Sequence, residues 1–79
     1  MKRYFMEYES DKINYSSSRE DFRNSHTYGY ASTVKTAKSY IRECRKRYSD
    51  QNPRNFRIYD SYADVDPETN FVPCVYHED

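Results

Sequence analysis

The sequence contains no leucine and no tryptophan, and it has a single glycine among 79 residues. One glycine cannot build the glycine-rich loop with which nucleotide-binding proteins cradle a phosphate. No apolar run approaches the roughly 20 residues that cross a bilayer. Glu7 and Glu9 follow the first residues too closely for a secretory signal peptide. We therefore expect a cytoplasmic protein without a membrane span, and residues 1–79 are predicted to form a single small α+β domain.

Tyrosine takes the place of the missing large aliphatic residues. The chain has ten tyrosines, whereas valine, isoleucine and phenylalanine together number eleven. The formal net charge is zero, so the chain lacks the self-repulsion that is typical of disordered sequences. We expect tyrosine rings to supply much of the buried surface, with each hydroxyl hydrogen-bonded to a partner group or to water.

Metal ligands are few. A structural zinc site needs four nitrogen or sulfur ligands, and the chain offers only His26, Cys44, Cys74 and His77. Within this set only Cys74-x-x-His77 has a ligand-like spacing. Both cysteines fall on predicted core-facing positions, and without a secretory signal a reducing compartment is expected. We predict two buried thiols, and neither a metal site nor a cofactor.

Catalytic patterns are equally sparse. Asp64-x-Asp66 could bind Mg²⁺, but the turn-forming residues around it favour a solvated loop. His77 beside Glu78 is a histidine–carboxylate pair of the kind that transfers protons, but no nucleophile accompanies it. The sequence is therefore interpreted as non-enzymatic.

Hydrophobic periodicity predicts an α+β fold in the order β-α-β-β. One amphipathic helix would pack on a three-stranded or four-stranded, mainly antiparallel sheet. The predicted strands cover residues 2–9, 55–62 and 71–77, and the predicted helix covers residues 33–48. On the helix, the apolar residues recur at intervals of three and four: Val34, Ala37, Ile41, Cys44 and Tyr48. Pro73 cannot donate to a strand ladder, so the last strand should be an edge or carry a bulge.

Residues 10–31 leave alternatives open. A structureless loop of this length would be unusual in so small a domain, so the segment should contain a short element. Residues 12–16 could pair back on the first strand, or residues 18–21 could form one helical turn. The Tyr28-Gly29-Tyr30 stretch is interpreted as a turn in which the glycine takes a positive φ.

The zero net charge hides a strong segregation. Residues 32–49 carry six lysines and arginines and one glutamate, whereas residues 58–79 carry six carboxylates and no lysine or arginine. Five of the basic residues share one face of the predicted helix, beside its apolar stripe: Lys35, Lys38, Arg42, Arg45 and Lys46. This basic helix face is either a solvated surface or a site for nucleic acid or an acidic protein.

The acidic segment is the preferred candidate for a partner contact. Pairing of the last two strands would bring its carboxylates together with three tyrosines. The predicted contact residues are Asp60, Asp64, Asp66, Glu68, Tyr59, Tyr62 and Tyr76. The carboxylates would attract a basic protein surface and guide its approach, and the rings would supply the buried area of the contact. The alternative is a solvated turn whose charges matter little to stability.

One helix can cover only one face of a sheet, yet the predicted strands carry large residues on both faces. The other face needs a cover, which could be residues 10–31, a second copy of the chain or a ligand. In the first case the segment would supply Ile13, Tyr15, Phe22, Tyr28 and Tyr30. Independently of this cover, the segregated charge allows the basic helix of one copy to meet the acidic hairpin of another in a homodimer.

The stretches ASTVKTAKSYIRECRKR and NPRNFRIYDSYADVDPETNFVPCVY resemble small proteins of phages and bacterial mobile elements. In size, tyrosine content and segregated charge, the chain is similar to phage-encoded anti-defence proteins of the anti-CRISPR type. The resemblance implies a stoichiometric inhibitor that occupies a nucleic-acid-handling surface of a host protein. It assigns no residue a role.

We rank three functions. The first is a non-enzymatic binding protein that acts by protein–protein contact, most concretely a phage or mobile-element inhibitor of a bacterial CRISPR-type defence nucleoprotein. The second is a nucleic-acid-binding module that uses the basic helix and a tyrosine-bearing sheet face. Zero net charge counts against this second function, because a basic domain is expected for it. The third is a dimeric structural protein.

Overall fold

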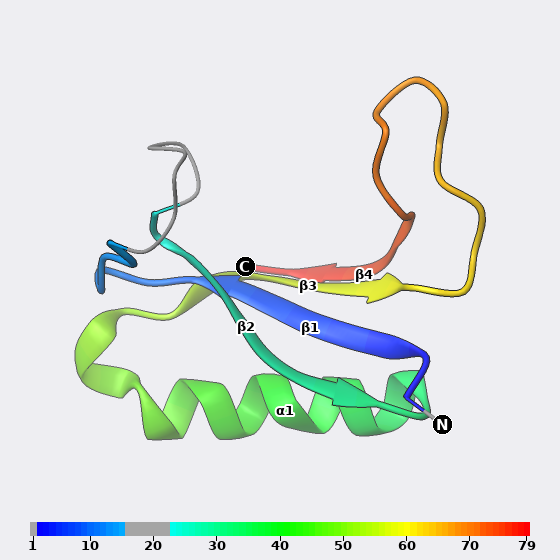
Figure 1. Ribbon diagram of the computed structural model, residues 1–79. Coiled ribbons are helices and arrows are strands. Elements are labelled where there is room, and N and C mark those ends of the chain that lie inside the picture. The colour runs from blue at the N-terminus through cyan, green and yellow to red at the C-terminus, as the bar shows by residue number, and fades with distance from the viewer. Residues whose placement is uncertain (1, 16–22) are drawn as a thin grey trace.

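The computed structural model describes residues 2–15 and 23–79, which fold as one helix packed on a four-stranded sheet (Figure 1). The elements are β1 (Tyr4–Glu9), β2 (Ser25–Ala31), α1 (Val34–Arg47), the short 3-10 helix η2 (Ser49–Gln51), β3 (Arg54–Asp60) and β4 (Cys74–Glu78). The sheet order is β2-β1-β3-β4, and every adjacent pair is antiparallel. The predicted α+β fold is confirmed in its four-stranded form. In this part of the chain, no helix is long and apolar enough to cross a membrane.

Helix α1 forms where the three-four spacing predicts it. Thr33 caps the amino terminus, because its Oγ1 accepts a hydrogen bond from the backbone N–H of Thr36 at 3.1 Å. Three arginine and lysine residues occupy the last turn, where the helix dipole favours positive charge. The chain then leaves through η2 and Asn52, whose left-handed φ of 53° does not continue a right-handed helix.

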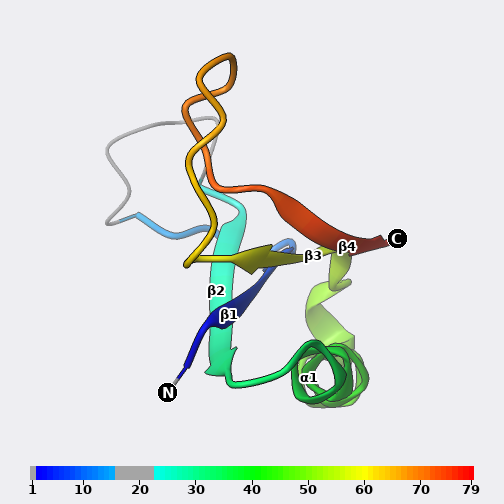
Figure 2. The same cartoon turned by 90° about the vertical axis from the view of Figure 1, so that its right-hand side faces the viewer.

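The core lies between α1 and one face of the sheet (Figure 2). Its most deeply buried side chains, at most 2% exposed, come from the helix stripe and the two central strands: Ala37, Ile41, Cys44, Met6, Phe56 and Ile58. Successive side chains of a strand point to opposite faces. The core residues of β1 and β3 therefore leave their sequence neighbours on the far side of the sheet.

Tyr8 is part of this core, and other tyrosine rings pack around it. Tyr8 is buried, stacks on Tyr48 with ring centroids 6.0 Å apart, and meets Tyr28 edge-on at 6.3 Å. Burial raises the pKa of Tyr8 to about 12. Tyr40 donates its hydroxyl to the carbonyl oxygen of Tyr30 at 3.1 Å. The rings close the core beside β2, while a hydroxyl such as that of Tyr40 keeps a hydrogen-bond partner.

The Tyr28-Gly29-Tyr30 stretch is a strand, so its interpretation as a turn is wrong. Gly29 lies inside β2 opposite Met6, and its φ is not positive. A Cβ added at Gly29 would lie 3.4 Å from the ring of Tyr40. Because Gly29 has no side chain, the ring of Tyr40 packs directly over the backbone of β2. A glycine within a strand often marks such a close approach of another group to the backbone.

The fourth strand is β2, and residues 12–15 do not supply it. These residues have no strand structure, so the prediction that they pair back on β1 is wrong. The N–H of Asn14 instead donates to the carbonyl oxygen of Arg23 at 2.6 Å. Residue 16 and the predicted helical turn at residues 18–21 lie outside the described residues.

The two cysteines differ in burial. Cys44 is buried as predicted, and burial raises the pKa of its thiol to about 11. Cys74 is exposed, so the prediction of a second buried thiol is wrong. The register of β3 and β4 shifts between Ile58 and Tyr59, so that Tyr59 pairs with Cys74. This irregularity follows directly after Pro73 and breaks the simple alternation on which the prediction depends.

An ion pair holds the start of the β3–β4 loop, which comprises residues 61–73. Arg3 donates through Nε and Nη2 to the two carboxylate oxygens of Asp60, at 2.8 and 2.7 Å. The Asp60 residue is only 7% exposed, and the hydrogen bonds from Arg3 lower its pKa. Its Oδ1 also accepts from the N–H of Tyr62 at 3.0 Å, and the N–H of Ser61 donates to the carbonyl oxygen of Arg3 at 2.9 Å. These bonds determine the direction in which the loop leaves the sheet.

Replacing Ile41 by alanine should lower the free energy of unfolding by about 2–5 kcal/mol, because it opens a cavity between α1 and the sheet. Urea denaturation followed by circular dichroism measures this change. Val65→Ala is the control, since Val65 is 49% exposed on the loop. A loss below about 0.5 kcal/mol for Ile41→Ala, as at surface positions, would contradict the packing of α1.

Replacing Arg3 by glutamine should destabilise the protein more at pH 7 than at pH 3. The folded-state pKa of Asp60 is depressed, so the pair contributes stability above the unfolded-state pKa, and this contribution is lost as pH falls through the folded-state pKa. Urea denaturation of R3Q and the parent protein at both pH values measures the difference. The control is Arg54→Gln, which removes an exposed pair with Asp11. An equal R3Q defect at both pH values would refute the assignment.

Candidate functional site

The sheet face opposite α1, here called the open face, is the candidate site. It carries the residues of β1 and β3 that alternate with the core positions, among them Phe5, Glu7, Arg57 and Tyr59. Figure 1 shows the β3–β4 loop rising from the sheet on the side away from α1, and Figure 2 shows the same arrangement along the helix axis. The loop and these side chains therefore share one side of the molecule.

Three aromatic rings form a row across the open face. Phe5 is the register partner of Tyr59 in β3 and of Tyr30 in β2. The ring centroids of Phe5 and Tyr59 are 5.2 Å apart in a stacked arrangement, and those of Phe5 and Tyr30 are 6.0 Å apart. Burial raises the pKa of Tyr59, whereas Tyr30 remains 53% exposed. Rigid rings of this kind supply contact area at little cost in conformational entropy.

Glu7 and Arg57 continue the open face beside this row and are register partners of each other. Arg57 donates through Nε to the carbonyl oxygen of Asn55 at 3.1 Å and through Nη2 to the hydroxyl of Ser25 at 3.0 Å. Glu7 accepts a hydrogen bond from the hydroxyl of Thr27 at 3.2 Å. Groups on β2 and β3 therefore hold the two charged side chains in place.

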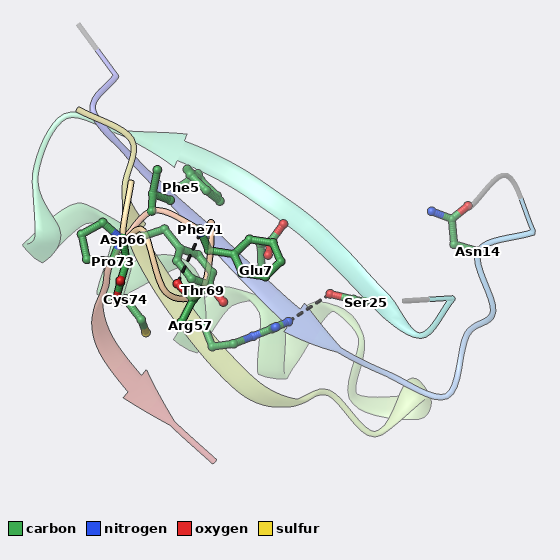
Figure 3. A pocket seen from close by; sticks show the side chains of 12 residues that line it. Phe5, Glu7, Asn14, Ser25, Arg57, Asp66, Thr69, Phe71, Pro73 and Cys74 are labelled. Atoms are coloured by element: carbon green, nitrogen blue, oxygen red, sulfur yellow. Dashed lines mark hydrogen bonds between the residues drawn. The ribbon is translucent and has the colours of Figure 1, made fainter. Parts of the chain in front are cut away.

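A cavity of about 930 Å³ lies between the open face and the β3–β4 loop (Figure 3). Phe5 and Tyr59 line it from the sheet, and Phe71 and Asp66 line it from the loop. In Figure 3 the side chain of Phe71 lies toward that of Phe5, and Cys74 stands nearby at the start of β4. The cavity thus brings together residues far apart in the sequence.

The loop side of the cavity is braced by its own hydrogen bonds. Asp66 Oδ1 accepts from the N–H of Glu68 at 2.9 Å. The N–H of Asp66 donates to the carbonyl oxygen of Phe71 at 3.0 Å, and the N–H of Asn70 donates to that of Asp66 at 2.7 Å. Asn70 takes a left-handed φ of 61° at this corner. The turn therefore presents Asp66 and Phe71 together.

The structure distributes the predicted acidic contact over both faces of the sheet. Asp60 is buried in its pair with Arg3. Tyr76 packs on the helix side, where Nζ of Lys38 lies 4.3 Å from its ring centroid, whereas Tyr59 lines the cavity. The other predicted residues belong to the loop and are exposed: Tyr62, Asp64, Asp66 and Glu68. Of the whole predicted set, Tyr59 and Asp66 are brought together at the cavity.

The basic helix face is partly engaged within the chain. Arg45 donates to the carboxylate of Glu78 and, at 2.8 Å, to the carbonyl oxygen of Asp79, and its guanidinium lies 4.7 Å from the ring centroid of Phe56. Tyr76 donates to Glu78 at 2.6 Å and lowers the pKa of that carboxyl. The remaining residues of this face are exposed: Lys35, Arg42 and Lys46. The acidic tail therefore offsets part of the basic charge.

The predicted cover of the open face is wrong for Tyr28. Its ring packs on the helix side, 5.7 Å from that of Tyr40. Ile13 and Tyr15 remain 42% and 80% exposed, and Phe22 lies outside the described residues. Tyr30 does lie on the open face, in the aromatic row. Within the described ranges, the β3–β4 loop stands over this face, and Asn14 of the predicted covering segment also lines the cavity.

The histidines and cysteines are dispersed. Nε2 of His77 lies 2.7 Å from Oδ1 of Asn55, and Nε2 of His26 lies 3.0 Å from the carbonyl oxygen of Lys12. Among residues 2–15 and 23–79, no three side chains of His, Cys, Asp and Glu gather closely enough to hold a metal ion.

The cavity itself is not foreseen from the sequence. The prediction names Tyr59 and Asp66 of the lining, and the residues that it omits include Phe5, Glu7, Arg57, Phe71 and Cys74. Strand alternation signals that Phe5 and Arg57 lie opposite the core. Phe71 is predicted within the last strand, and no local pattern reveals the turn that places it against the cavity.

Comparison with known proteins adds no residue roles. No protein-family model, curated protein or solved structure matches the chain. The function has therefore to be inferred from the chemistry of this chain's own side chains.

Proposed function

We propose that the protein is a non-enzymatic binding protein that acts by protein–protein contact through its open face and β3–β4 loop. The cavity of about 930 Å³ supports this proposal most directly, because its walls combine stacked aromatic rings with a loop that carries exposed carboxylates. Aromatic residues dominate the energetics of protein interfaces, and charged residues at the rim govern the approach of a partner.

The charge of the loop points to a basic partner surface. Asp64, Asp66 and Glu68 lie on the loop, and residues 58–79 contain no lysine or arginine. The resemblance to anti-defence proteins of the anti-CRISPR type supports a concrete version, in which the partner is a bacterial nucleoprotein and the loop occupies a surface that handles nucleic acid. A cytoplasmic setting would suit the two free thiols, Cys44 and Cys74.

Replacing Asp64, Asp66 and Glu68 together by serine should weaken partner binding at least tenfold, about 1.4 kcal/mol. The exposed carboxylates contribute to steering and to rim contacts, so their loss should leave thermal stability nearly unchanged. The partner is first captured from a nuclease-treated bacterial lysate, and its affinity for both proteins is then measured by calorimetry.

The control variant neutralises three exposed or partly engaged carboxylates elsewhere: Glu43, Asp50 and Asp79. It makes the same change in net charge, so a comparable loss of affinity in both triple variants would indicate a general charge effect. Unchanged affinity in a folded loop variant would remove the loop from the binding surface.

The alternative of nucleic-acid binding through the basic helix face is disfavoured, because Arg45 is bonded to Glu78 and Lys38 lies over Tyr76. We expect weak or no binding to DNA or RNA at physiological salt. Fluorescence anisotropy with single-stranded and double-stranded probes over a series of salt concentrations tests this expectation. Submicromolar, salt-sensitive binding that Lys38→Glu with Arg42→Glu abolishes would reverse the ranking of the two functions.

A further inference from the structure

The cavity under the β3–β4 loop has apolar walls on two sides. Phe5 and Tyr59 stack on the sheet, and Phe71 is accompanied on the loop by Val72 and Pro73. Phe71 is 60% exposed although it stands at a cavity lined by other rings. Removing such rings from water is favourable when an apolar group fills the space between them. The walls therefore suit an apolar side chain.

The charges around the cavity are mostly negative. Glu7 and Asp66 line it, and Asp64 and Glu68 lie on the same loop, where they form no ion pair with any described residue. Arg57 is the single basic residue of the described lining, and it lies opposite Glu7 in the strand register. This balance favours a ligand with cationic groups and disfavours an anionic one.

The volume limits the size of the ligand. About 930 Å³ lies near the upper end of the 300–1,000 Å³ range of pockets that hold small ligands. This space exceeds what one side chain requires, and it opens between a sheet and a loop rather than inside the core. A short extended peptide segment fits these dimensions.

We infer that the cavity takes a short basic and apolar segment of the partner protein. A leucine-type or phenylalanine-type side chain enters between Phe5 and Phe71, and lysine or arginine residues on either side of it approach Glu7 and Asp66. The buried apolar group acts as the anchor of the interface, and the flanking charges set its orientation. This inference rests on the proposed function and names the chemistry that the partner presents.

The test uses the intact protein and the peptide acetyl-Lys-Leu-Lys-amide as the probe. Amide chemical shifts in a ¹⁵N-labelled sample report where the peptide binds. Alkylation of Cys74 by N-ethylmaleimide, followed by mass spectrometry, reports occupancy of the cavity, because Cys74 is exposed and Cys44 is buried. We expect shifts at Phe5, Tyr59 and Phe71, and about fivefold slower alkylation at a peptide concentration of four times Kd.

Two variant pairs make the test specific. Phe71→Ser should lower the affinity for the peptide at least tenfold. Tyr62→Ser should leave this affinity unchanged, because Tyr62 is an exposed loop tyrosine outside the lining. Asp66→Asn should also weaken binding of the peptide while preserving the oxygen that accepts from Glu68. Asp50→Asn is its matched control, because Asp50 is exposed on η2 and lies outside the lining.

Two comparison peptides test whether the cavity recognises the positive charges and the apolar side chain of the ligand. Equal binding of acetyl-Glu-Leu-Glu-amide would overturn the charge assignment, and equal binding of acetyl-Lys-Ser-Lys-amide would overturn the apolar anchor. Shifts confined to residues outside the cavity, or unprotected Cys74, would overturn the inference as a whole. In that event the loss of partner affinity in the Asp64, Asp66 and Glu68 variant would still support the proposed function, so the two failures are distinguishable.

Discussion

Helix α1 offers one apolar stripe, and the sheet on which it packs has two faces. The stripe of Ala37, Ile41 and Cys44 is fully used against Met6, Phe56 and Ile58, so no helix is left for the other face within the described chain. Strand alternation nevertheless puts Phe5 and Tyr59 on that other face, because they are the neighbours of core residues. A monomeric protein of this size usually avoids such exposed aromatic patches unless they bind something. The candidate site is thus a direct consequence of the same alternation that builds the core.

The β3–β4 loop turns this exposed face into a cavity, and two sets of contacts hold the loop in place. At its start, the Arg3–Asp60 ion pair and the bond from Ser61 to the Arg3 carbonyl tie the loop to the segment that precedes β1. At its far end, the N–H of Asp60 donates to the carbonyl oxygen of Pro73 at 3.3 Å. Asp60 therefore contacts both ends of the loop. A carboxylate that the charge pattern suggests as a partner contact instead supports the backbone on which the contact residues sit.

Elements with a strong period could be predicted from the sequence, and contacts made by irregular backbone could not. The apolar spacing of α1 and the alternation of β1 and β3 are local signals, and all three elements are confirmed close to their predicted bounds. Strand β2 has a serine, a histidine and a glycine among its seven residues, and Gly29 serves a tertiary contact with Tyr40 rather than a turn. The exposure of Cys74 depends on the register shift beside Pro73. Pro73 predicts an edge strand or a bulge, but it does not predict which side chains the shift exposes. At the candidate site, Asp66 and Tyr59 follow from charge and pairing, whereas the position of Phe71 depends on a loop turn with a left-handed Asn70.

The placement of the two charge clusters explains how a chain of zero net charge can present a negative surface. The basic helix face lies on one side of the sheet, and the loop that carries Asp64, Asp66 and Glu68 rises on the other (Figure 1). The sheet lies between the two groups of charges, and they meet at β4, where Arg45 pairs with Glu78. Under the proposed function, a partner that approaches the open face would meet the carboxylates of the loop before any of the helix lysines and arginines, and this order would favour a basic segment.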